Sequence, residues 1–136
     1  MPRQYVSPSS SPPLPTATSS SPLTSTVLAL HGGAFMLGHS RMNSADQIAD
    51  CLERGWIVVA PEHRLCPQVD IHSGPMADVR DALEWVYDGG LERAIQDDGV
   101  KVDYDRVMAF GTSSGGGLAL SLVRLLSSSP PSMIWR

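Results

Sequence analysis

The chain has 136 residues, of which 42% are hydrophobic, and it carries a formal net charge of −4. This length suits one domain with one modest core. The charges are spread without a basic block, which argues against nucleic acid or an anionic membrane surface as the main partner. No apolar stretch approaches the ~20 residues that span a bilayer and no signal peptide is evident, so we expect a cytoplasmic protein without a membrane span.

Residues 1–23 are predicted to form a disordered tail. From Ser7 to Leu23 the sequence is dominated by serine and proline and offers almost no apolar surface to offset the entropy of ordering. The only cysteines, Cys51 and Cys66, lack the spacing of a metal-binding pair, so we expect reduced thiols and no metal site. The remaining residues, 24–136, are predicted to form one domain.

The first half of this domain has a strand-helix-strand pattern. The apolar run from Thr26 to Leu30 ends at His31-Gly32-Gly33 and is typical of a buried strand. A helix is predicted between the capping residue Ser44 and Gly55. A second apolar strand follows from Trp56 to Ala60.

The second half repeats this alternation. A helix is predicted from Pro75 to Gly89-Gly90, followed by a loop rich in Asp and Gly, a strand from Arg106 to Phe110 and a helix from Ser114 to Leu126. None of the strands alternates apolar and polar residues. The sequence therefore predicts an α/β fold with a three-stranded parallel sheet and helices on both faces.

Gly111-Thr112-Ser113-Ser114-Gly115 stands between the last strand and the last helix. A serine flanked by glycines at a strand-to-helix turn indicates a nucleophile elbow, which would present Ser113 to substrate, with Gly111 and Gly115 permitting the sharp bend. The turn His31-Gly32-Gly33-Ala34 follows the first strand and resembles an oxyanion loop. We predict that the backbone N–H groups of Gly33, Ala34 and Ser114 stabilise an oxyanion, while His31 and Gly32 shape the loop.

Three motifs resemble the hormone-sensitive-lipase-like branch of the α/β-hydrolases, also called fold-3 esterases. They are HGGAF, EHRLCPQ and GTSSGG, in the order of that family, and the similarity covers residues 26–126. The resemblance implies a serine carboxylesterase or lipase without cofactor, acting on small carboxylic esters, with Ser113 as nucleophile. The chain departs from the family pattern at four positions: Ala34 replaces glycine, Glu62 and His63 replace Asp and Tyr, and Thr112 replaces Asp.

In this family the catalytic acid and histidine follow the nucleophile in the sequence. No Asp, Glu or His follows Leu126 here, so we expect an incomplete, truncated α/β-hydrolase domain that lacks the triad Asp and His and is poorly active alone. His31 is predicted to shape its loop rather than to act as the base. His39, His63 and His72 are expected to be ordinary loop histidines.

Other interpretations remain open at this point. The chain could be a non-catalytic binding or pairing module that associates with itself through exposed sheet edges, or a truncated product of a longer hydrolase gene. The GxSxG pattern could also be a plain structural turn. A phosphate-binding loop fits poorly, because GTSSGGG lacks the spacing of GxGxxG and no lysine follows it.

Overall fold

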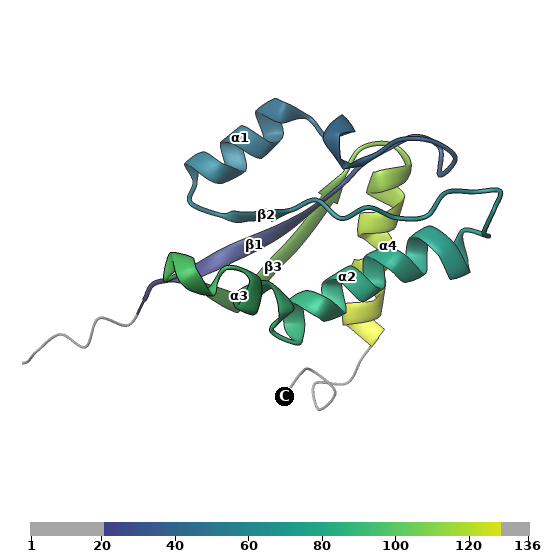
Figure 1. Ribbon diagram of the computed structural model, residues 1–136. Helices are drawn as coiled ribbons and strands as arrows, with labels where there is room; N and C mark the ends of the chain where they lie inside the picture. Colours follow the sequence, from purple (N-terminus) through teal and green to yellow (C-terminus); the bar gives the residue numbers. More distant parts are fainter. Residues whose placement is uncertain (1–20, 129–136) are drawn as a thin grey trace, which may run out of the picture.

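The computed structural model describes residues 21–128 (Figure 1). The predicted disordered tail therefore lies outside the described residues except for positions 21–23. The elements in chain order are β1 (Leu23–Leu30), η1 (Ser40–Met42), α1 (Ala45–Glu53), β2 (Ile57–Val59), η2 (His72–Met76), α2 (Ala77–Tyr87), α3 (Gly90–Ala94), η3 (Gln96–Asp98), β3 (Lys101–Gly111) and α4 (Ser114–Ser128). None of the helices within residues 21–128 is long and apolar enough to cross a membrane.

The three strands form one parallel sheet, as the sequence predicts, and their order in the sheet is β2-β1-β3. In the central strand, Val27 is in register with Val58 of β2 on one side and with Met108 of β3 on the other. Parallel strands end at the same edge of a sheet, so the loops that follow β1 and β3 emerge side by side. This topology brings the two glycine-rich motifs together.

Helices cover both faces of the sheet, which confirms the predicted α/β class. The core on one face contains β1 residues packed against apolar side chains of α2 and α4; its members include Leu28, Leu30, Val79, Leu83, Leu118 and Leu122. On the other face, Cys51 of α1 and Phe110 of β3 line one shallow hollow. In Figure 1, α1 lies on the opposite side of the strands from α2.

The region before β3 differs from the prediction of a plain loop. β3 begins at Lys101 rather than Arg106, because Leu23 and Thr24 of β1 pair with Lys101 and Val102 beyond a register shift. The short helix α3 also lies in this region, where Leu91 is buried in the core. The start of β3 and the helix α3 were not predicted, because polar residues interrupt the apolar runs that indicate strands and helices.

Tyr104 joins β3 to α3, since its hydroxyl donates to Oε2 of Glu92 at 2.7 Å. Burial and this hydrogen bond raise the pKa of Tyr104 to about 12. The folded state thus holds the phenolic proton more tightly than the unfolded chain, where the pKa is about 10. The stabilisation is complete below pH ~10 and is lost as the pH rises toward 12.

We therefore expect the urea midpoint of the wild type to fall between pH 9 and about pH 11.5. The Tyr104→Phe variant should be less stable at pH 9 and should lose less stability over this range, as measured by circular dichroism. The pKa of Tyr87 is also raised by burial, so some loss persists in the variant. Equal losses in the two proteins would show that Tyr104 is not linked to folding.

Candidate active site

Ser113 occupies the tight turn between β3 and α4. Its φ is 54°, in the left-handed region that residues with a side chain rarely adopt, and the residue is exposed. The turn is closed by the N–H of Gly115, which donates to the carbonyl of Thr112 at 2.9 Å. α4 begins at Ser114, so Ser113 precedes the helix rather than lying inside it. The structure thus places an exposed hydroxyl at the carboxyl end of a strand.

Close backbone packing explains the glycines around this turn. A Cβ atom at Gly115 would lie 2.1 Å from the carbonyl oxygen of Leu30, and one at Gly111 would lie 2.3 Å from the carbonyl carbon of Gly115. Both distances are far below van der Waals contact, and the atoms they would meet are backbone. The start of α4 can therefore approach the end of β1 only because these two positions carry no side chain.

The loop after β1 has a strained backbone. Gly33 has a φ of 126°, and Ala34 and Phe35 follow with φ values of 54° and 63°. The N–H groups of Met36 and Leu37 both donate to the carbonyl of Gly33 at 3.0 Å and close the loop. Non-glycine residues in such conformations cost about 1–3 kcal/mol each and are concentrated at functional sites.

The two strained segments meet in space. A Cβ atom at Gly32 would lie 2.8 Å from the carbonyl oxygen of Thr112 and 3.2 Å from Cβ of Ser113. Within residues 21–128, Ala34, Phe35 and Ser113 are the only non-glycine residues with positive φ. The backbone strain of the described chain is therefore gathered where the loop after β1 faces the turn after β3.

The predicted oxyanion donors have free N–H groups. No hydrogen bond within the described residues uses the backbone N–H of Gly33, Ala34 or Ser114. Ser114 is also the first residue of α4, where the helix dipole favours negative charge. These N–H groups are therefore available to donate to an added group.

Two stacked histidines, His31 and His63, lie beside the loop after β1. His31 is fully buried, and its ring stacks on that of His63 with 4.2 Å between the ring centroids and 10° between the planes. Nδ1 of His31 lies 2.8 Å from the carbonyl oxygen of Gly32. This contact places the ring of His31 against its own loop. His63 is buried and stacked, unlike the ordinary loop histidine predicted from the sequence. The one sequence signal for the contact between His63 and His31 is that His63 closely follows the strand β2.

No histidine within residues 21–128 forms a hydrogen bond with Ser113. His39 instead accepts a hydrogen bond from the N–H of Arg41, and His72 is exposed at the start of η2. The chain contains four histidines in all. The described residues also contain no group of three or more His, Cys, Asp or Glu side chains that could hold a metal ion.

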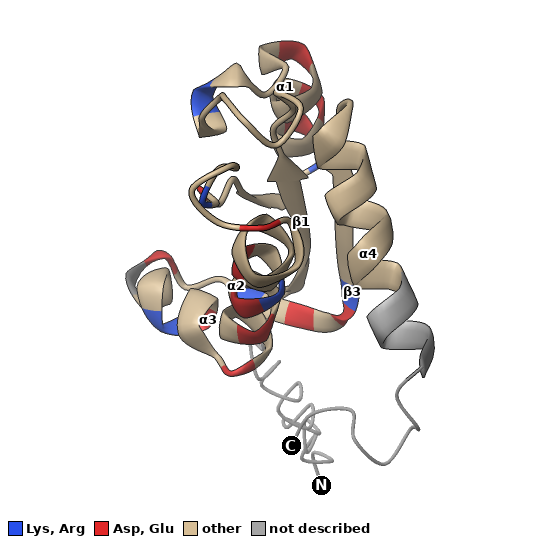
Figure 2. Ribbon diagram, turned by 90° about the vertical axis from the view of Figure 1, so that its right-hand side faces the viewer, with Lys and Arg blue, Asp and Glu red and all other residues tan. Residues whose placement is uncertain are grey.

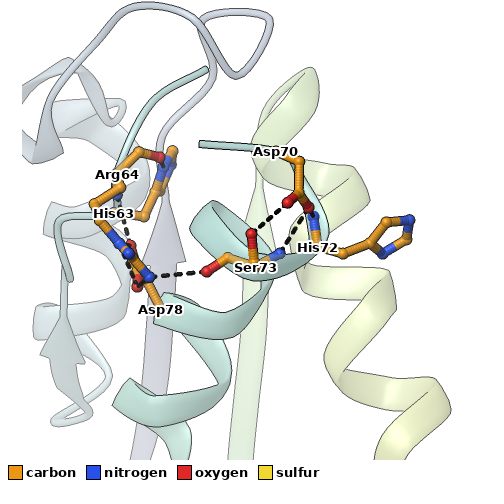
Figure 3. A network of polar contacts seen from close by, with 6 residues as sticks. All are labelled: His63, Arg64, Asp70, His72, Ser73 and Asp78. Atoms are coloured by element: carbon orange, nitrogen blue, oxygen red, sulfur yellow. Dashed lines mark hydrogen bonds and ion pairs between the residues drawn. The ribbon is translucent and has the colours of Figure 1, made fainter. Parts of the chain in front are cut away.

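The segment after β2 carries the third motif, EHRLCPQ, and is fastened to α2 (Figure 3). The backbone N–H of Arg64 donates to Oδ2 of Asp78 at 2.7 Å, and its guanidinium group binds both oxygens of that carboxylate and the carbonyl of Ser73. Hydrogen bonding from Arg64 holds the pKa of Asp78 below its usual value. Nearby, Asp70 accepts hydrogen bonds from the N–H groups of His72 and Ser73.

Comparison with known proteins identifies the family. The BD-FAE family model matches residues 13–128. Among curated proteins, the non-reducing polyketide synthase atr1 of Stereocaulon alpinum is 39% identical over 94 residues, which are 69% of this chain and 4% of that protein. The methylphloroacetophenone synthase of Cladonia uncialis is 35% identical over 95 residues, with 70% and 4% covered. The chain thus spans about 4% of the length of these relatives.

Solved esterase structures share the fold. A bacterial heroin esterase matches with a TM-score of 0.64 and 26% identity, covering 82% of this chain and 32% of that chain. A thermophilic carboxylesterase cloned from a metagenomic library matches with a TM-score of 0.59 and 32% identity, covering 79% and 34%. The resemblance to hormone-sensitive-lipase-like esterases is confirmed, and this chain spans about a third of each of these structures.

Proposed function

The chain belongs to the BD-FAE family, and on that premise we propose that it is the nucleophile-bearing part of a serine hydrolase acting on small carboxylic esters. Its α/β-hydrolase fold and its esterase neighbours already make it a hydrolase-like module. One observation supports Ser113 as the nucleophile: the strained loop after β1 lies against the strained turn at Ser113. If the turn at Ser113 were only structural, strained backbone in both the turn and the facing loop would not be expected, because such strain is concentrated at functional sites.

In the proposed mechanism, Oγ of Ser113 attacks the carbonyl carbon of the ester and forms a tetrahedral intermediate. The carbonyl oxygen becomes an oxyanion, and the N–H groups of Gly33, Ala34 and Ser114 donate to it. One such donor typically stabilises the transition state by about 3 kcal/mol. A base takes the proton of Oγ during the attack and gives it to the departing oxygen, so collapse of the intermediate breaks the ester C–O bond, expels the alcohol and leaves Ser113 acylated. Water then attacks the acyl group by the same route, which releases the acid and restores the hydroxyl of Ser113.

The serine hydroxyl needs a base, and none of the four histidines is hydrogen bonded to Ser113 in the described structure. We propose that the residues seen here supply the nucleophile and the oxyanion donors, and that the base and its acid partner come from elsewhere. Loss of a triad histidine typically lowers kcat by ~10⁶, while the oxyanion hole and binding retain 10³–10⁴ over water. Low intrinsic activity is therefore expected.

We further propose that residues 24–136 form a single module of a larger protein. The similarity to segments of polyketide synthases supports this, because those proteins carry the matching residues within much longer chains.

The test compares the full chain with its Ser113→Ala variant in hydrolysis of p-nitrophenyl acetate. We expect slow hydrolysis by the wild type and none above background in the variant. Added imidazole, which can replace a missing base, should raise the wild-type rate by more than it raises the rate of the variant. Equal rates in the two proteins, with and without imidazole, would reject Ser113 as the nucleophile.

Pairing through exposed sheet edges is a second candidate function, favoured by the apolar surface beside β3. A hollow of about 260 Å³ on this side is lined only by apolar residues: Leu83, Val107, Met108, Ala109, Leu122 and Val123. α4 carries no charge from Ser114 to Val123 (Figure 2). Size-exclusion chromatography tests this candidate, since a stable monomer at high concentration would contradict it.

A further inference from the structure

The strained loop after β1 is held from outside by the segment that follows β2. The N–H of Cys66 donates to the carbonyl of Phe35 at 2.7 Å, at one of the strained positions. The N–H of Ser40 donates to Oε1 of Glu62 at 2.9 Å. Between these two contacts, the ring of His63 lies against that of His31. Oε2 of Glu62 also lies 3.8 Å from Nε2 of His31. Strained conformations persist only where the surroundings fix them, and this segment supplies such contacts.

His63 is buried, whereas Glu62, its neighbour in the segment after β2, is exposed. Only 8% of its surface is exposed, whereas the side chain of Glu62 is 61% exposed. Nδ1 of His63 lies 3.2 Å from the carbonyl oxygen of Arg64, and Nε2 has no hydrogen-bond partner among the described residues. The contact of Nδ1 stays within the segment itself, so no hydrogen bond joins this ring to the loop after β1. The contact between the ring and the loop is the flat stacking on His31.

The position of His63 is itself fixed by the core. Its neighbour Arg64 fastens the segment to α2 through Asp78 and the carbonyl of Ser73, as Figure 3 shows. α2 packs into the core through Val79 and Val86, which are fully buried. A continuous series of contacts thus runs from α2 through Arg64 and His63 to His31, the residue that follows β1.

We propose that His63 is a positioning residue: by stacking on His31 it fixes the loop that bears the oxyanion donors, a role that rests on the proposed function. The contact requires a flat ring rather than a proton, so an aromatic ring without nitrogen should replace His63. The EHRLCPQ motif then acts as the external support of the loop, and not as a part of the reaction itself.

Hydrogen exchange of the full chain tests this proposal in the wild type and in His63→Ala, His63→Phe and the control His72→Ala. The probes are the N–H groups of Met36 and Leu37, which donate to Gly33 and report loop closure. We expect exchange at both probes to be about tenfold faster in His63→Ala and close to wild type in His63→Phe. The His72→Ala variant should resemble the wild type, because His72 is exposed.

Amides of Leu28 and Leu30 in β1 report the stability of the whole domain. If His63→Ala leaves the loop probes unchanged, or if it accelerates β1 equally, the positioning role is rejected. The same holds if His63→Phe fails to restore protection. The outcome is independent of catalysis: a wild type without Ser113-dependent hydrolysis but with the expected exchange pattern would reject the proposed function and keep the role of His63 in holding the loop.

Discussion

The Gly115→Val variant is expected to lose at least about 3 kcal/mol of its free energy of unfolding. The first side-chain carbon would lie 2.1 Å from the carbonyl oxygen of Leu30 and 2.7 Å from that of His31. Both atoms belong to the backbone at the end of the central strand, so no side-chain rotation can relieve the clash. α4 would have to move away from β1, and the core between them contains Leu28 and Leu118.

Gly117 in the same helix provides the matched control. A Cβ atom there would meet only Cζ of Phe35, at 3.9 Å, which is an ordinary contact. Because alanine favours a helix interior over glycine, Gly117→Ala should gain up to about 1 kcal/mol. Urea unfolding followed by circular dichroism measures both variants. Similar midpoints for Gly115→Val and Gly117→Ala would mean that the close approach of helix and strand does not stabilise the fold.

The Gly33→Ala variant is expected to remain folded and to lose about 100-fold of the Ser113-dependent hydrolysis rate. An added methyl group would lie 1.9 Å from the carbonyl oxygen of Leu37, and the φ of 126° is unfavourable for alanine. The loop would have to reopen and carry its N–H groups away from the serine. Its surface position limits the cost to the rest of the fold.

Ala34→Gly is the control for this experiment. Its φ of 54° is readily adopted by glycine, so the loop should retain its shape and the variant should hydrolyse ester at close to the wild-type rate. The measurement is the rate of p-nitrophenyl acetate hydrolysis minus that of Ser113→Ala. A Gly33→Ala variant as active as Ala34→Gly would show that the conformation of the loop does not matter for the reaction.

The sheet and the turn at Ser113 could be predicted because their signals are local. Short apolar runs mark the strands, and glycines on both sides of the serine mark the bend. The start of β3 could not be found this way, since Asp103 and Asp105 interrupt the apolar pattern while backbone pairing with β1 extends the strand. α3 has only five residues and depends on the burial of Leu91, which is a tertiary effect.

The positions of the two glycine-rich motifs could be predicted from the sequence, but the contacts that hold the loop after β1 could not. The motif predicts donor positions at Gly33 and Ala34, but positive φ at Phe35 has no sequence signal, because non-glycine residues rarely adopt it. The contact between His31 and His63 joins loops from two different strands and follows from the parallel pairing of β1 with β2. A single sequence does not show which of several loop histidines will be buried.

We propose that the fold presents Oγ of Ser113 at a tight bend, where it can attack an acyl centre or the phosphorus of a reactive phosphonate. The most direct test is prolonged reaction of the full chain with a fluorophosphonate, followed by mass spectrometric mapping of the adduct in native buffer and in urea. We expect a slow adduct on Ser113 in native buffer only, and none in Ser113→Ala. An adduct on other residues, or equal modification of Ser113 in urea, would contradict this proposal.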